Sequence, residues 1–150
     1  MGRGTHNWER QSIEDLQSYE KKKQSISNIT EQIEILNMQY TALRGQAFDS
    51  SPIQGGGIRM EDHLLDNIVK RERLQMNLSA VKRMVHLIER GLHSLDARER
   101  EVLEVYYINR PDRYIDRLKE KYHVEQAEIY RMKDKAIYNF TIGMYGFTDY

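Results

Sequence analysis

Residues 74–95 read LQMNLSAVKRMVHLIERGLHSL and carry the most regular pattern in this chain of 150 residues. Large apolar side chains recur there at alternating intervals of four and three residues, at Leu74, Leu78, Val81, Val85, Ile88, Leu92 and Leu95. This spacing gathers the apolar side chains on one face of an α-helix, as in the seam of a coiled coil. The pattern predicts a long helix from about Met60 to Leu92, whose apolar line continues backwards to Leu64.

A second heptad pattern precedes the first in the chain. Its apolar residues form two lines with a period of seven, Tyr19, Ile26, Ile33 and Tyr40, and Ile29, Leu36 and Leu43. We expect a helix from about Glu9 to Arg44, with Lys21-Lys22-Lys23 marking a solvated or frayed start. Gly, Ser, Asp and Pro gather in residues 45–59 and predict a flexible linker. Two long helices joined by one loop fold back as an antiparallel hairpin, and their surplus apolar surface predicts a homodimer or a higher homo-oligomer.

The rest of the chain, residues 95–150, predicts three shorter helices. Asp96 followed by Glu99 is typical of a capping box, which starts a helix that ends near Asn109-Arg110-Pro111. A short helix over about Asp112–Tyr122 and a final helix from Glu125 to about Phe140 follow. Tyr122-His123 occupies the turn where many helix-turn-helix motifs carry Gly, so another residue must accept the unusual backbone angle there. We expect the tail, residues 141–150, to be irregular or frayed.

The predicted fold is therefore all-α. A long coiled-coil-like helical hairpin comprises a first helix within residues 1–44, a linker at 45–59 and a dimerisation arm at 60–94. A three-helix, sigma-like helix-turn-helix follows at 95–150.

The last helix of such a module leaves one face free for the major groove of DNA. The candidate DNA-binding residues of that helix are Gln126, Glu128, Tyr130, Arg131, Lys133, Asp134 and Lys135. Gln and Arg pair well with purine edges, whereas Lys133, Lys135, Arg113 and Arg117 are placed to contact phosphates and fix the register.

Two stretches resemble region four of bacterial sigma factors. The first, Leu95-Asp96-Ala97-Arg98-Glu99-Arg100-Glu101-Val102-Leu103-Glu104-Val105-Tyr106-Tyr107, resembles the opening of that region, and the second, residues 124–136, resembles its recognition helix. The chain more closely resembles phage late-gene transcription regulators of the ArpU/RinA type, which carry a Tyr-Arg-x-x-x-Lys-Ala run, here residues 130–136. The resemblance implies binding to double-stranded promoter DNA, activation of late or packaging genes, and a place in the cytoplasm of the bacterial host.

Composition excludes several other classes of protein. The 23 basic and 23 acidic side chains cancel, so a strongly basic protein that coats nucleic acid is excluded. The absence of cysteine excludes a disulfide scaffold and a thiolate metal site. No apolar run reaches the length of a membrane span, so a soluble cytoplasmic protein is expected. No catalytic spacing, metal-ligand spacing or phosphate loop occurs, so we expect neither an enzyme nor a bound cofactor.

Two alternatives stay open on the sequence alone. A small terminase subunit also combines a helix-turn-helix with a coiled coil, although there the DNA-binding module usually comes first in the chain. The second alternative is a protein that docks on RNA polymerase without touching DNA. The segment from Asp96 onward supports it, because ten basic side chains there face eleven acidic ones.

Overall fold

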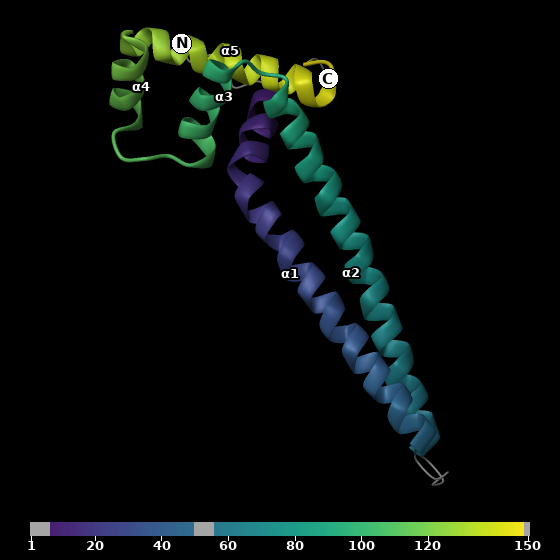
Figure 1. The fold of residues 1–150 in the computed structure, drawn as a ribbon. Coiled ribbons are helices and arrows are strands. Elements are labelled where there is room, and N and C mark those ends of the chain that lie inside the picture. Colours follow the sequence, from purple (N-terminus) through teal and green to yellow (C-terminus); the bar gives the residue numbers. More distant parts are fainter. Residues whose placement is uncertain (1–6, 50–55, 149–150) are drawn as a thin grey trace. The chain divides into compact units, whose positions relative to one another are not determined.

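The computed structural model describes residues 7–49 and 56–148, and every regular element in these ranges is a helix. The elements are α1 (Asn7–Asp49), α2 (Gly56–His93), α3 (Ala97–Leu103), a π-helical turn η1 (Glu104–Ile108), α4 (Tyr114–Tyr122) and α5 (Gln126–Tyr145). The described part of the chain holds no strand, and α1 and α2 run alongside each other as a helical hairpin (Figure 1). The predicted all-α class is confirmed.

The chain forms two units, which are described separately. The helix-turn-helix unit comprises Met1–Lys22 and Met84–Tyr150, and the hairpin unit comprises Lys23–Arg83. The start of α1 and the end of α2 thus belong to the same unit as α3, α4 and α5. The segments expected from the sequence, 1–44, 60–94 and 95–150, do not coincide with these units.

The main core of the helix-turn-helix unit joins both chain segments of the unit, through the start of α1, the end of α2, α3 and α5. Its buried members are Leu16, Ile88, Leu92, Leu95, Leu103, Ala136, Ile137, Phe140 and Met144. Leu16 of α1 and Phe140 of α5 have no exposed surface at all. Full burial of one such side chain contributes about 1.5–3 kcal/mol, so the start of α1 is a substantial part of this core.

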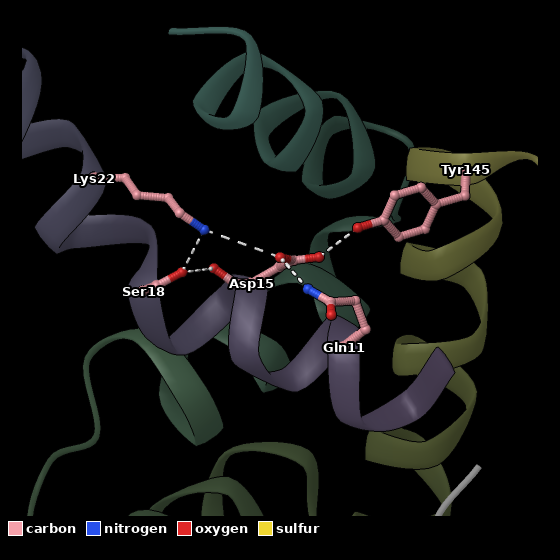
Figure 2. A network of polar contacts seen from close by, with 5 residues as sticks. All are labelled: Gln11, Asp15, Ser18, Lys22 and Tyr145. Atoms are coloured by element: carbon pink, nitrogen blue, oxygen red, sulfur yellow. Dashed lines mark hydrogen bonds and ion pairs between the residues drawn. The ribbon is translucent and has the colours of Figure 1, made fainter. Parts of the chain in front are cut away.

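Polar side chains also lie inside this unit and join α1 to α5. The hydroxyls of Ser12 and Thr141, both fully buried, are 2.6 Å apart. Thr141 also donates to the carbonyl oxygen of Ile137, so Ser12 is the donor to Thr141. Figure 2 shows a second link, in which the hydroxyl of Tyr145 donates to a carboxylate oxygen of Asp15 at 2.6 Å.

Of the solvated or frayed start expected at Lys21-Lys22-Lys23, the fraying is wrong, because α1 continues through these residues, whereas Lys21 and Lys23 are exposed to solvent. The ammonium of Lys22 donates to Ser18 at 2.8 Å and lies 4.0 Å from a carboxylate oxygen of Asp15 (Figure 2). Lys22 and Asp15 occupy seam positions, since they continue the seven-residue line of Ile29 backwards. The seam therefore extends toward the N-terminus through polar residues that find partners in the fold.

The expected irregular tail is also wrong over residues 141–145, which complete α5. Thr141 and Met144 are buried against the rest of the unit, and this packing holds the last turn. Gly146 then ends the helix with a φ of 83°, and its N–H donates to the carbonyl oxygen of Ile142 at 2.8 Å. Glycine adopts this left-handed conformation without steric cost, which makes it the usual residue just after a helix.

The hairpin unit buries much less than the helix-turn-helix unit. Among its described side chains, only Ile33 and Asn67 are buried, and the other seam residues are half-buried. Asn67 donates to the carbonyl oxygen of Leu36 at 2.8 Å, and Arg71 donates to the side-chain oxygen of Asn37 at 2.8 Å. These two bonds set the register in which α1 and α2 pair.

The expected linker at 45–59 is wrong at both ends, because α1 runs to Asp49 and α2 begins at Gly56. Ala and Gln are good helix formers, and one glycine at position 45 costs a long helix only about 1 kcal/mol. Residues 50–55, which include Pro52 and Gly55, lie outside the described residues.

Candidate nucleic-acid interface

A tight turn joins α4 to α5, and His123 makes it possible. His123 adopts the left-handed conformation, with φ 54° and ψ 48°, and its N–H donates to the carbonyl oxygen of Lys119. Glu125 is extended and starts α5. The residue expected to accept the unusual backbone angle in place of Gly is therefore His123. Such a conformation is uncommon for residues other than Gly, although His adopts it more readily than most.

One face of α5 is buried and the opposite face is exposed. Ile129, Ala136, Ile137 and Phe140 lie on the buried face. The exposed face carries five of the predicted DNA-binding residues, which are Gln126, Tyr130, Arg131, Asp134 and Lys135. The side chain of Arg131 is 75% exposed, whereas Glu128 beside it is half-buried. The fold thus leaves the Gln/Tyr/Arg side of α5 open to a partner.

Polar side chains on and beside this face pair with each other, through an ion pair and a hydrogen bond. Arg131 lies 3.2 Å from a carboxylate oxygen of Glu128, one turn earlier in the helix. Gln126 donates through its amide to the hydroxyl of Tyr130. Exposed pairs of this kind contribute about 0–1 kcal/mol each, so either partner can exchange them for contacts with a ligand.

Lys133 stands apart from the other candidates, because it is only half-buried at the edge of a tyrosine cluster. Its ammonium lies 5.6 Å from the ring centroid of Tyr106, 5.8 Å from that of Tyr130 and 3.1 Å from a carboxylate oxygen of Asp134. Burial raises the pKa of Tyr106 above its usual value, and its hydroxyl finds no hydrogen-bond partner among the described residues. Lys133 therefore packs over aromatic rings as well as facing solvent.

The two predicted phosphate contacts outside α5, Arg113 and Arg117, are both exposed. Arg113 takes the left-handed conformation, with a φ of 58°, just before α4, and Arg117 lies within α4. Arg110, which was not among the predicted contacts, has a structural role. Its guanidinium donates twice to the carbonyl oxygen of Tyr106, at 3.0 and 3.2 Å, and lies 4.2 Å from the ring centroid of Tyr114. Arg110 thereby closes the end of η1.

The start of α3 lies beside the exposed face of α5. Asp96 caps α3 by accepting from the N–H of Glu99 at 2.7 Å, as the sequence predicts, and this bond lowers the pKa of Asp96. The carboxylate of Glu99 accepts from the side-chain amide of Asn139 at 2.6 Å and so joins α3 to α5. Both acids line a hollow of about 280 Å³ together with Arg98, Glu128, Arg131, Met132 and Lys135. Arg98 escaped the sequence-based set, because only the packing of α3 on α5 brings it near Arg131.

The described residues hold no group of three or more His, Asp or Glu side chains that could hold a metal ion. No described helix has an apolar stretch long enough to cross a membrane. Comparison of the chain with protein-family models, with curated proteins and with solved structures finds no match.

Proposed function

We propose that this protein is a sequence-specific DNA-binding activator of phage late or packaging genes, which works in the cytoplasm of the bacterial host. The observation that carries the proposal is the exposed face of α5, where Gln126, Tyr130 and Arg131 stand free of the core after a tight turn. A helix that projects Gln and Arg from a helix-turn-helix suits the hydrogen-bonding pattern of purines in the major groove. The sigma-like sequence of residues 95–107 and 124–136 supports the same proposal.

The charges of this face bear on how strongly the protein would bind random DNA compared with a specific site. Arg131 and Lys133 each have an acidic neighbour within 3.2 Å, which weakens the general attraction to phosphates. Binding to random DNA is therefore expected to be weak. Base contacts and a second copy of the module must supply most of the affinity for a specific site.

Replacing Arg131 with alanine tests the proposal directly. If Arg131 pairs with a base, Arg131→Ala lowers affinity for the specific duplex by about 1–3 kcal/mol, which is roughly a 5- to 150-fold rise in Kd. Fluorescence anisotropy with labelled duplexes from the DNA that flanks the protein's own gene measures the change. Arg10→Ala is the matched control, since it removes the same charge from an exposed position of α1.

An unchanged Kd in Arg131→Ala would remove this residue from the interface. If the wild-type chain binds none of the flanking duplexes at low salt, the DNA-binding proposal fails. An assembly of eight or nine copies in solution would favour the small terminase subunit instead.

A second candidate function is docking on RNA polymerase without DNA contact. The acid–base alternation on α5 favours it, because a neutral, polar face suits a protein partner as well as a nucleic acid. Pull-down of purified polymerase by the full chain, combined with no salt-dependent binding to duplex DNA, would support this candidate over the first.

A further inference from the structure

The hairpin unit carries more apolar surface than two helices can cover. Large apolar side chains stand exposed there at Ile35, Met38, Leu65, Val69 and Met76. Only Ile33 and Asn67 are buried among the described side chains of this unit. A unit of this size with so small an interior is marginal by itself, because it keeps too much of its apolar surface in water.

One part of this surface is hollowed into a groove. Ile35 and Leu36 of α1 and Leu74 of α2 line it with apolar atoms, and Lys70 and Arg73 form its basic edge. The groove has a volume of about 370 Å³ and is open to solvent. Its lining suits a partner that brings apolar side chains for the floor and acidic side chains for the edge.

α1 of this same chain carries both apolar and acidic side chains near Ile35. Glu31 and Glu34 are exposed on α1, and Glu31 stands one helical turn before Ile35. Among the residues that the structure describes, neither glutamate forms an ion pair, and neither does Lys70 or Arg73. The groove therefore has a basic edge on α2, whereas Glu31 and Glu34 lie on α1 outside its lining, and neither the acidic pair nor the basic pair forms an ion pair among the described residues.

We propose that the groove of the hairpin unit is a two-fold self-association surface that takes α1 of a second copy of this chain. In a two-fold interface the same patch meets itself, so Ile35 packs near Ile35 of the partner subunit. Glu31 and Glu34 of each copy then face the basic edge of the other copy's groove. The product is a four-helix assembly, in which the half-buried seam of each copy is covered on the side of the groove. This proposal does not depend on DNA binding, and its test uses no DNA.

Reversing the two charged rows separately gives a sharp test. The variant Glu31→Lys/Glu34→Lys makes the charges at positions 31, 34, 70 and 73 all positive. The variant Lys70→Glu/Arg73→Glu makes the same four charges negative. Each variant alone is expected to dimerise at least roughly tenfold more weakly than the wild type, because like charges meet across the interface. An equimolar mixture of the two variants regains the dimer, because every charge then faces its opposite. Sedimentation velocity of the full chain, with circular dichroism as a check of folding, measures both effects.

Glu14→Lys/Glu20→Lys is the matched control, since it makes the same change at exposed positions of α1 outside the hairpin unit, and its dimer should be as tight as the wild type. An independent readout uses the absence of cysteine from the chain. Ile35→Cys should form an intermolecular disulfide on mild oxidation, whereas Gln17→Cys, also exposed on α1, should not.

Three outcomes would overturn the proposal. The first is a wild-type chain that stays monomeric at micromolar concentration, and the second is a dimer that neither charge-reversed variant weakens. The third is a mixture of the two variants that associates no better than either alone. A failure of any DNA-binding experiment would leave this surface unaffected.

Discussion

Single residues control how closely the helices of the helix-turn-helix unit approach. Gly91 of α2 faces Phe140 and Met144 of α5 so closely that a Cβ atom there would lie 2.8 Å from a ring carbon of Phe140. A Cβ on Gly143 would lie 3.2 Å from the Cα of Gly91. These two glycines let α2 and α5 touch nearly backbone to backbone, because neither carries a side chain at the crossing.

We therefore expect opposite effects from two helical Gly→Ala substitutions. Gly91→Ala forces the buried Phe140 ring aside and should lower the free energy of unfolding by about 1–3 kcal/mol. Gly45→Ala meets nothing within 4 Å and should raise it by about 0.5–1 kcal/mol, because alanine is the better helix former. Urea unfolding followed by circular dichroism measures both. Equal effects from the two substitutions would contradict the close approach at Gly91.

At the scale of elements, Glu101 ties α3 to α4. Its carboxylate accepts from the ammonium of Lys121 and from the hydroxyl of Tyr122. The bond from Lys121, followed by that from Tyr122, lowers the pKa of Glu101 below its usual value. Burial, followed by the bond to Glu101, raises the pKa of Tyr122 to about 12. This link holds the first helix of the turn motif against the helix that precedes it.

The lowered pKa of Glu101 predicts a dependence of stability on acid. A carboxyl group whose pKa is lower in the folded state contributes its full stability above the unfolded pKa, about 4.3 for Glu. That contribution is lost as the pH falls through the folded pKa. The difference in unfolding free energy between wild type and Glu101→Gln should therefore shrink as the pH is lowered from about 6 to about 3. Denaturant titrations at several pH values measure it, and a constant difference would argue against the link.

At the scale of the whole molecule, the C-terminal helices α3, α4 and α5 form one folding unit with the start of α1 and the end of α2. Leu16 of α1, and Ile88 and Leu92 of α2, belong to the same core as Phe140 and Met144 of α5. Together the burial of the first three contributes about 5–9 kcal/mol, at about 1.5–3 kcal/mol each. A typical domain has only about 5–15 kcal/mol of net stability, so the module depends on both long helices.

We accordingly expect the isolated fragment 95–150 to lack cooperative unfolding. Thermal melts by circular dichroism should show a gradual loss of helix in this fragment and a sharp transition in the full chain. Adding a peptide of residues 7–22 to the fragment 84–150 should restore a cooperative transition, because the peptide returns Leu16 to the core. A sharp transition in 95–150 alone would show that the helix-turn-helix folds independently.

Sequence periodicity by itself determined the all-helical class, the two long helices and the inward faces of α3, α4 and α5. Val102, Leu103, Leu118 and Ile129 are apolar residues on the inner faces of these helices, and all four are buried. The cap at Asp96 and the outward side of α5 follow from the same local rules. Helix ends were harder to predict. Lys22 is held by Ser18 and Asp15 of the same helix, whereas residues 141–145 stay helical because they pack against segments distant in the chain.

Only the tertiary structure decided which segments share a core and which polar residues are interior. Ser12, Asp15 and Thr141 look like surface residues in the sequence, yet each is buried with a partner more than a hundred residues away. No local pattern encodes such a pairing, because the free energy of burying a polar group depends on the particular atom that meets it. For the same reason, the sequence does not predict that Asp96, Arg98 and Glu99 share a hollow with Arg131, because this depends on how α3 packs against α5.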